Sequence, residues 1–405
     1  MSPVRPLRAA LFAVFAATAI VAAAQQIAPQ RSWPELKQET QARADRNAYP
    51  LTGLDKSEVR EALSHITSLD RDEWAAAFSA VAQRHVAAAA AAEAAGEGQK
   101  AHDEYMAAWR LYSFARWPTP NSPGKQKAYA QALDAFRHAM RSMQPAPQIV
   151  RIPFEGKEIV GYLRMPERVQ GRAPLVISIS ALDSRKEENI ERSDLLVGRG
   201  VAVFAVDMPG TGEAPVTVDV DSERMFSRAL DVLLARPDID ASRVAVQGVS
   251  WSGYWAAKLA IVERQRIKAA VVQGGPAHGY FQPEWQLKAL GTREYLFDLP
   301  AARQAIYGSR TVEEFLAYGP KLSLQRLGLL EQPSAPMLLV NGERDTQVPI
   351  ADLDLLLHHG SPKEAWVNPT GGHVGRSAEW NDSRIYAEVV APWLLRQLRV
   401  PAAQP

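Results

Sequence analysis

The sequence predicts an α/β protein: a mostly parallel sheet with helices on both faces, preceded by a separate helical domain. Three observations support this prediction. Residues 33–143 show helical periodicity. After "QPAP" the pattern changes to short apolar strands separated by helices. The chain has 405 residues, enough for one large and one smaller domain with a sizeable core.

The amino-terminal residues 1–24 have the pattern of a secretory signal peptide. Arg5 and Arg8 precede an apolar run that ends at Ala24 in a small-x-small pattern. We therefore expect cleavage before Gln25 and a periplasmic or secreted protein with no stable membrane association. A retained membrane anchor is the alternative, but the run falls short of the ~20 residues that a spanning helix needs.

Composition excludes several classes of protein. The net charge of +1 offers no basic field for nucleic acid. Cysteine is absent, which excludes disulfides, a thiol nucleophile and cysteine-ligated zinc. No cluster has the spacing of metal ligands, so the sequence predicts neither a metal nor another cofactor. The sequence is compatible with a homodimer.

The helical domain is expected over residues 27–145. Its long alanine-rich helix should stop at Gly96 and Gly98, and two further helices should be separated by "RWPTPNSPG", whose three prolines forbid a continuous helix. We interpret this domain as a packed cap over the sheet. Trp117 lies in the proline-rich break and is therefore a candidate for the substrate pocket.

The sheet domain is expected over residues 146–400. "QIVRIPF" and "EIVGYLRMP" flank "EGK" and predict a hairpin, and six buried strands follow, from "APLVISIS" to "EAWVNP". About sixty residues separate two of these strands, which is too many for a simple crossover. We interpret residues 279–330 as a helical insertion that contributes to a lid.

The segment "GVSWSGY" contains two serines, and its position indicates which one is the nucleophile. It joins a strand to a helix, where a nucleophile elbow requires small residues two positions before and after the reactive serine. Around Ser250 these residues are Gly248 and Ser252, whereas around Ser252 one of them is Tyr254, which is too large. Ser250 is therefore the predicted nucleophile.

A base and an orienting acid are expected at the same edge of the sheet. Asp345 in "NGERDTQVP" follows one buried strand, and His373 in "TGGHVG" follows the next. The chain order of serine, acid and histidine matches a hydrolase with a strand-to-helix elbow. Glu343 is the rival for the acid, but Asp345 begins the turn and has the shorter side chain.

Two further groups of residues are candidates around this triad. The backbone N–H groups of Trp251 and of Ala181 or Leu182 are expected to stabilise an oxyanion. His278 follows the strand after the elbow, where it would either line the pocket or be a hydrogen-bonded loop histidine.

These motifs together resemble the FrsA-like branch of the α/β-hydrolase superfamily. The resemblance rests on the helical amino-terminal region and on "GYLRMP", "ALDSRKEE", "DMPGTGE", "GVSWSGY", "NGERDTQVP" and "GGHVG". It implies an α/β-hydrolase fold, a pocket between cap and sheet, and the triad Ser250, Asp345 and His373. The sequence departs from the expected pattern at Ser180-Ala181 and at Ser252, where glycines are expected.

The sequence thus predicts an exported serine hydrolase that cleaves a small-molecule carboxylic ester through an acyl-enzyme. Members of the branch divide between ester hydrolysis and cleavage of a carbon–carbon bond beside a ketone, and the triad does not separate these two reactions. A catalytically silent binding protein is the alternative from another class.

Overall fold

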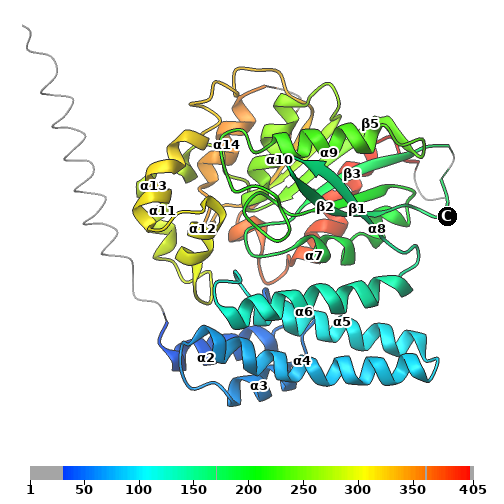
Figure 1. The fold of residues 1–405 in the computed structure, drawn as a ribbon. Coiled ribbons are helices and arrows are strands. Elements are labelled where there is room, and N and C mark those ends of the chain that lie inside the picture. Colours follow the sequence, from blue (N-terminus) through cyan, green and yellow to red (C-terminus); the bar gives the residue numbers. More distant parts are fainter. Residues whose placement is uncertain (1–30, 170, 361–362, 402–405) are drawn as a thin grey trace, which may run out of the picture.

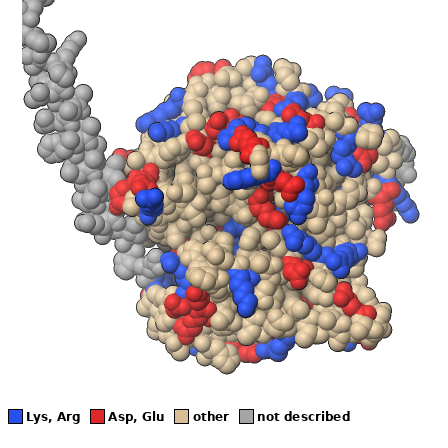
Figure 2. All heavy atoms as spheres, in the orientation of Figure 1, with Lys and Arg blue, Asp and Glu red and all other residues tan. Residues whose placement is uncertain are grey.

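The computed structural model describes residues 31–169, 171–360 and 363–401. Figure 1 shows a helical layer packed against a larger body built around a sheet. The predicted signal peptide, residues 1–24, lies outside the described residues. Positive and negative side chains are interspersed over the face shown in Figure 2, in keeping with the small net charge.

The helical region contains five α-helices and a short 3₁₀ turn within residues 33–142. They are α2 (Trp33–Asp45), α3 (Lys56–Ser64), α4 (Arg71–Ala94), α5 (Gly98–Ala115), α6 (Pro123–Ala139) and η1 (Met140–Ser142). Gly96, with φ of +74°, ends the long helix as expected, whereas Gly98 begins the next helix. The proline-rich break lies between α5 and α6, and Pro123 occupies the first turn of α6, where its missing N–H costs nothing.

The sheet has eight strands in the order β1-β2-β4-β3-β5-β6-β7-β8. Their bounds are β1 (Gln148–Phe154), β2 (Lys157–Arg164), β3 (Ala173–Ile179), β4 (Ala202–Val206), β5 (Ile239–Val249), β6 (Ala269–Gln273), β7 (Met337–Gly342) and β8 (Lys363–Asn368). The predicted hairpin is β1–β2, and β2 pairs with β4 in antiparallel orientation. All other pairs are parallel, which confirms the mostly parallel sheet.

Helices cover both faces of the sheet. One face packs against α9 (Arg224–Leu234), α10 (Trp251–Val262) and α14 (Ile350–His358). The opposite face packs against α8 (Asp194–Val197) and α16 (Ala391–Gln397). Alternate residues of β3 serve the two layers, since Leu175 and Ile177 belong to the first core and Val176 to the second.

Shorter helices complete the body. They are α7 (Lys186–Glu191), α11 (Pro283–Leu290), α12 (Leu299–Tyr307), α13 (Val312–Tyr318) and α15 (Asp382–Ile385), with the short turns η2 (Gly279–Phe281), η3 (Gly319–Leu322), η4 (His373–Gly375) and the π-helical η5 (Tyr386–Val390). The helices α11 to α13 form the expected insertion between β6 and β7.

An ion-pair cluster joins the insertion to the helical region. The carboxylate of Asp298, before α12, accepts two hydrogen bonds of 2.8 Å from the Arg71 guanidinium at the start of α4. The Lys125 ammonium of α6 lies 3.3 Å from the same carboxylate and is fully buried. The two parts of the chain are therefore joined by charges as well as by apolar packing.

Two features are absent from the described part of the chain. No helix there combines the length and the apolar character needed to span a bilayer. In the same residues, His, Asp and Glu side chains form no group of three or more that could hold a metal ion.

Candidate active site

Ser250 occupies a strained turn between β5 and α10. Its φ of 56° and ψ of −127° are unfavourable for a residue with a side chain. The turn is fixed by hydrogen bonds from the Ser250 N–H to the Gln273 carbonyl (2.7 Å) and from the Gly253 N–H to the Ser250 carbonyl (2.8 Å). This is the strand-to-helix geometry that a nucleophile elbow requires.

The two small residues that lie two positions from Ser250 in the chain have different structural roles. A Cβ at Gly248 would lie 2.1 Å from the Ser252 carbonyl oxygen, so no side chain fits there. Ser252 is fully buried, its Oγ accepts the Val249 N–H at 2.8 Å, and it lies 3.0 Å from the Ile179 carbonyl oxygen. Of the two serines in the motif, Ser252 is therefore enclosed, and Ser250 faces a cavity.

Asp345 lies just past the carboxyl end of β7 and is 7% exposed. Its Oδ1 accepts backbone N–H groups from Gln347 (2.7 Å) and Val348 (3.0 Å), and its Oδ2 lies 2.8 Å from His373 Nδ1. Burial alone would raise the pKa of Asp345, but the His373 ring and the N–H donors hold the pKa below its usual value. The carboxylate is thus kept ionised behind the imidazole.

His373 connects Asp345 to Ser250. The ring is buried, with Nδ1 beside Asp345 and Nε2 2.7 Å from Ser250 Oγ. Since the ionised carboxylate accepts a hydrogen bond from Nδ1–H, Nε2 is left unprotonated and can accept the serine proton. A hydrogen bond of 2.9 Å from the Gln273 amide to the Val374 carbonyl holds the histidine loop against β6.

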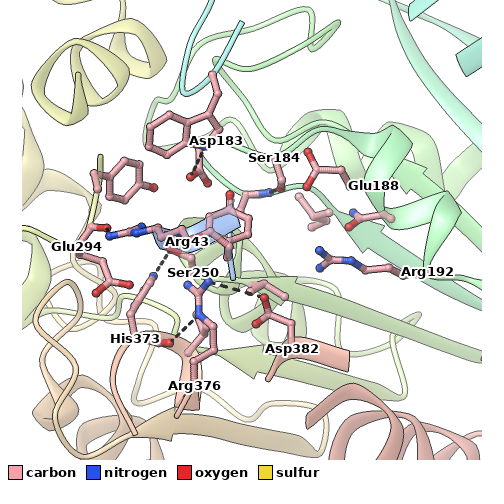
Figure 3. Close-up of a pocket in the computed structure, with 18 residues that line it drawn as sticks. Arg43, Asp183, Ser184, Glu188, Arg192, Ser250, Glu294, His373, Arg376 and Asp382 are labelled. Carbon is pink, nitrogen blue, oxygen red and sulfur yellow. Dashed lines mark hydrogen bonds and ion pairs between the residues drawn. The ribbon is translucent and has the colours of Figure 1, made fainter. Parts of the chain in front are cut away.

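A cavity lies in front of Ser250 and encloses about 690 Å³ when its open mouth is included. Figure 3 shows Ser250 near the middle of the lining residues and His373 to its lower left, with charged side chains around them. The helical region contributes Arg43, Tyr49 and Trp117 to the wall. The insertion contributes Glu294 and Tyr295, and the sheet domain contributes the other lining residues.

Comparison with known proteins agrees with this fold. The model of the FrsA-like esterase family matches residues 55–364, which is most of the chain. The protein belongs to the FrsA-like esterase family. The match gives a residue range and no site, so the roles of Ser250, Asp345 and His373 rest on their contacts.

Curated relatives of this FrsA-like protein include esterases and other hydrolases. It is 25% identical to the esterase FrsA of Vibrio parahaemolyticus over 280 residues, 66% of each chain. It is 29% identical to the alpha/beta hydrolase ucsC of an Acremonium species over 249 residues, 55% of this chain and 50% of the relative. The chain thus spans about half to two thirds of these relatives.

A solved structure shares the fold over a longer stretch. The 2,6-dihydroxy-pseudo-oxynicotine hydrolase superposes with a TM-score of 0.73 at 24% identity, covering 85% of this chain and 93% of its own. The helical amino-terminal region and the sheet domain of this FrsA-like chain therefore form an α/β-hydrolase fold with an added helical cap.

The other predicted site residues of the FrsA-like chain have different positions. Trp117 and Ala181 line the cavity, but the Ala181 N–H already donates to Ser184 Oγ at 2.9 Å. Neither Leu182 nor Trp251 belongs to the lining, and both are buried. His278 does not line it either, because its Nδ1 lies 2.7 Å from Ser323 Oγ; this is the hydrogen-bonded loop histidine of the alternative prediction.

Sequence reasoning did not identify Asp183 as a wall residue. Its carboxylate accepts the Trp117 indole N–H at 3.1 Å, and its carbonyl accepts the Arg116 guanidinium at 2.6 Å. Burial together with this carboxylate raises the pKa of the Tyr49 and Tyr295 phenols well above the usual value. Asp183 lies in the "SALDSRKEE" loop, next to a predicted oxyanion donor. This position in the sequence could have identified it as a residue of the cavity wall.

Three more charged residues of the wall, Glu188, Arg376 and Asp382, were not predicted from the sequence either. The Arg376 guanidinium lies 4.8 Å from the Tyr49 ring and 3.7 Å from the Asp382 carboxylate. Burial raises the pKa of Glu188 to about 7, although the guanidinium groups of Arg116 and Arg192 oppose this shift. The cavity wall therefore combines charged side chains with apolar and aromatic ones.

The arrangement has the components needed for nucleophilic acyl transfer. A serine hydroxyl contacts an imidazole nitrogen, and the other ring nitrogen contacts a buried carboxylate. A cavity opens over the hydroxyl, so a carbonyl compound can approach it.

Proposed function

We propose that the protein is an exported serine hydrolase that cleaves a carboxylic ester through Ser250, His373 and Asp345. The observation that carries the proposal is the continuous contact from Ser250 Oγ to His373 (2.7 Å) and from His373 to Asp345 (2.8 Å). Membership of a family of esterases supports ester hydrolysis as the chemistry.

In the first half of the reaction, Ser250 Oγ attacks the acyl carbon of the ester and its proton passes to His373 Nε2. The carbonyl oxygen becomes an oxyanion, and Asp345 stabilises the imidazolium without taking its proton. Collapse of the intermediate breaks the ester bond, and His373 gives the proton to the departing alcohol oxygen. An acyl-enzyme and a free alcohol result.

In the second half, water attacks the acyl carbon while His373 accepts one of its protons. Collapse of the second intermediate returns that proton to Ser250 and releases the carboxylic acid. The balance is one ester and one water converted to one acid and one alcohol, with no further reactant.

Carbon–carbon cleavage beside a ketone would use the same acyl-enzyme and differ only in the leaving group. A screen of aryl esters of increasing acyl length beside β-diketones separates the two reactions. Turnover of ketones without turnover of esters would contradict the proposal.

Labelling with a fluorophosphonate probe, followed by peptide mapping, tests the enzyme against a catalytically silent binding protein. We expect the modification on Ser250. Failure of the folded protein to react, or modification of another serine, would contradict the proposed nucleophile.

Export is the second part of the proposal. Arg5 and Arg8 before an apolar run that ends at Ala24 support a cleaved signal peptide. Mass spectrometry of the protein from the periplasm or medium of its host should find Gln25 as the first residue. An intact Met1 on membrane-bound protein would contradict export.

A further inference from the structure

The loop between β3 and α7 contains the Ser184 hydroxyl, which has no role in the mechanism proposed above. We infer that the Ser184 side chain donates the second hydrogen bond to the oxyanion, in place of the predicted backbone N–H of Ala181 or Leu182. The inference rests on the proposed function, since it concerns the same acyl transfer at Ser250.

The contact between Ala181 and Ser184 is the first observation. The Ala181 N–H donates to Ser184 Oγ at 2.9 Å, so this donor is already used within the loop. Among the hydrogen bonds of the described residues, the Ser184 hydroxyl acts only as an acceptor. Ser184 lines the same cavity as Ser250 and His373, where a substrate carbonyl would lie.

A hydroxyl in this position is well suited to bind a developing negative charge. Accepting a hydrogen bond polarises an O–H group and strengthens the bond that it donates. The other oxyanion donor is the N–H of Trp251, in the first turn of α10, where backbone N–H groups have no partner inside the helix. The Ser184 proton stays on its own oxygen throughout, so the hydroxyl stabilises charge and transfers nothing.

The loop is held firmly enough to aim a donor. Asp207 Oδ1 accepts the Ser180 hydroxyl at 3.1 Å and the Lys186 N–H at 2.9 Å, and so fixes both ends of the segment 180–186. The Arg185 guanidinium donates to the Ser184 carbonyl at 2.6 Å. A donor placed before the reaction begins is what makes oxyanion stabilisation effective.

The test compares Ser184→Ala and Ser184→Thr with the wild-type protein on p-nitrophenyl acetate. Loss of one oxyanion donor typically lowers kcat by about 10²-fold or more. We expect a loss of about 100-fold in kcat with little change in KM for Ser184→Ala, and activity within about fivefold of wild type for Ser184→Thr, which keeps the hydroxyl. The affinity of a trifluoromethyl ketone, which forms an oxyanion on the serine, should fall in parallel with kcat.

Ser113→Ala is the matched control, because Ser113 lines an adjoining cavity and not the one that contains Ser250. Thermal unfolding shows whether each variant is folded. If Ser184→Ala does not fold, the activity of Ser184→Thr decides. A folded Ser184→Thr variant without activity overturns the inference. A folded Ser184→Ala variant with unchanged or higher kcat would also overturn it, because a backbone N–H of Ala181 or Leu182 would then be the donor. Failure of the proposed function would be visible separately, as wild-type protein that the fluorophosphonate does not label at Ser250.

Discussion

The sheet domain and the helical region contribute to the cavity in different ways. Ser250, Asp345 and His373 each follow the carboxyl end of a strand, and hydrogen bonds to the backbone hold Ser250 and Asp345 in place. The residues from the helical region lie at helix ends and turns instead: Arg43 in the last turn of α2, and Trp117 just past α5. Tyr49 lies in the turn after α2.

This difference separates the chemistry from the selection of substrate. The reacting groups depend on a strand ladder and can tolerate changes elsewhere, whereas the wall depends on side-chain contacts between segments far apart in the chain. Substitutions in the two regions should therefore affect different measurable quantities, and each of the following experiments tests that expectation.

The largest effect is expected in the sheet domain, at the elbow. Ser250→Ala should lower kcat/KM for an activated ester by about 10⁴-fold or more without changing stability. Ser252→Ala should keep substantial activity but lower the free energy of unfolding by about 1–3 kcal/mol, because it removes a buried hydroxyl that bonds the Val249 N–H and the Ile179 carbonyl. Ester kinetics and denaturant unfolding measure both. An inactive Ser252→Ala beside an active Ser250→Ala would reverse the assignment.

The second effect concerns the junction at Asp298. Asp298→Asn removes the charge that faces the fully buried Lys125 ammonium, and breaking such a pair costs about 3–5 kcal/mol. Thermal unfolding should show a clear loss of stability, while phosphonate labelling of Ser250 below the transition continues. Glu155→Ala is the matched control, because it removes only a solvent-exposed pair with Arg224 and should lower stability far less than Asp298→Asn. Equal losses in the two variants would show that the junction contributes nothing special.

A smaller effect is expected at the wall. Trp117→Phe keeps an aromatic ring but removes the hydrogen bond to Asp183. We expect the ratio of kcat/KM for a bulky aryl ester to that for an acetyl ester to change by about tenfold, equivalent to about 1.4 kcal/mol. The rate of reaction with a small phosphonate should change far less, because Arg116 still holds the Asp183 carbonyl. If the phosphonate reacted more slowly while the ratio of kcat/KM for the two esters stayed the same, Trp117 would act on the reaction at Ser250. The proposed difference between the two regions would then be wrong.

The smallest effect lies in the helical region, far from the cavity. His85 contacts the carboxylates of Glu58 and Glu104 at 2.6 Å each, and hydrogen bonding to Glu58 raises the pKa of His85 to about 9. Because the folded-state pKa is above the unfolded value, this stabilisation is complete below about pH 6.5 and is lost as the pH rises through about 9. After solvent screening it amounts to roughly 1 kcal/mol. Unfolding free energies of wild type and His85→Gln should therefore converge above pH 9, and a difference that stays constant with pH would contradict this account.

Much of the fold could be predicted because its signals are local. The hairpin around "EGK", the apolar strands and the prolines before α6 each follow from a few adjacent residues. The elbow belongs to the same class, since Gly248 and Ser252 identify Ser250 by size alone. β5 begins earlier than the apolar pattern indicates, at Ile239, where polar residues such as Asp240 continue the strand.

The rest of the site could not be predicted because it depends on contacts between distant segments. Tyr49 and Tyr295 have no periodic pattern, and they reach the cavity only through the packing of the helical region and the insertion on the sheet. The Ala181 donor was predicted from its place after β3, but a side chain three positions later in the same loop takes its N–H. His278 is at the expected edge, yet Ser323 of the insertion holds it away.

The two bonds that Asp183 forms with the helical region make access and reactivity interdependent. Arg116 holds its carbonyl and Trp117 its carboxylate, and the next residue in the chain is Ser184. Any displacement of the cap that widened the entrance would pull on this loop and disturb its donors. In the described conformation both bonds are formed, so the position of the helical region and the position of the Ser184 loop are set together.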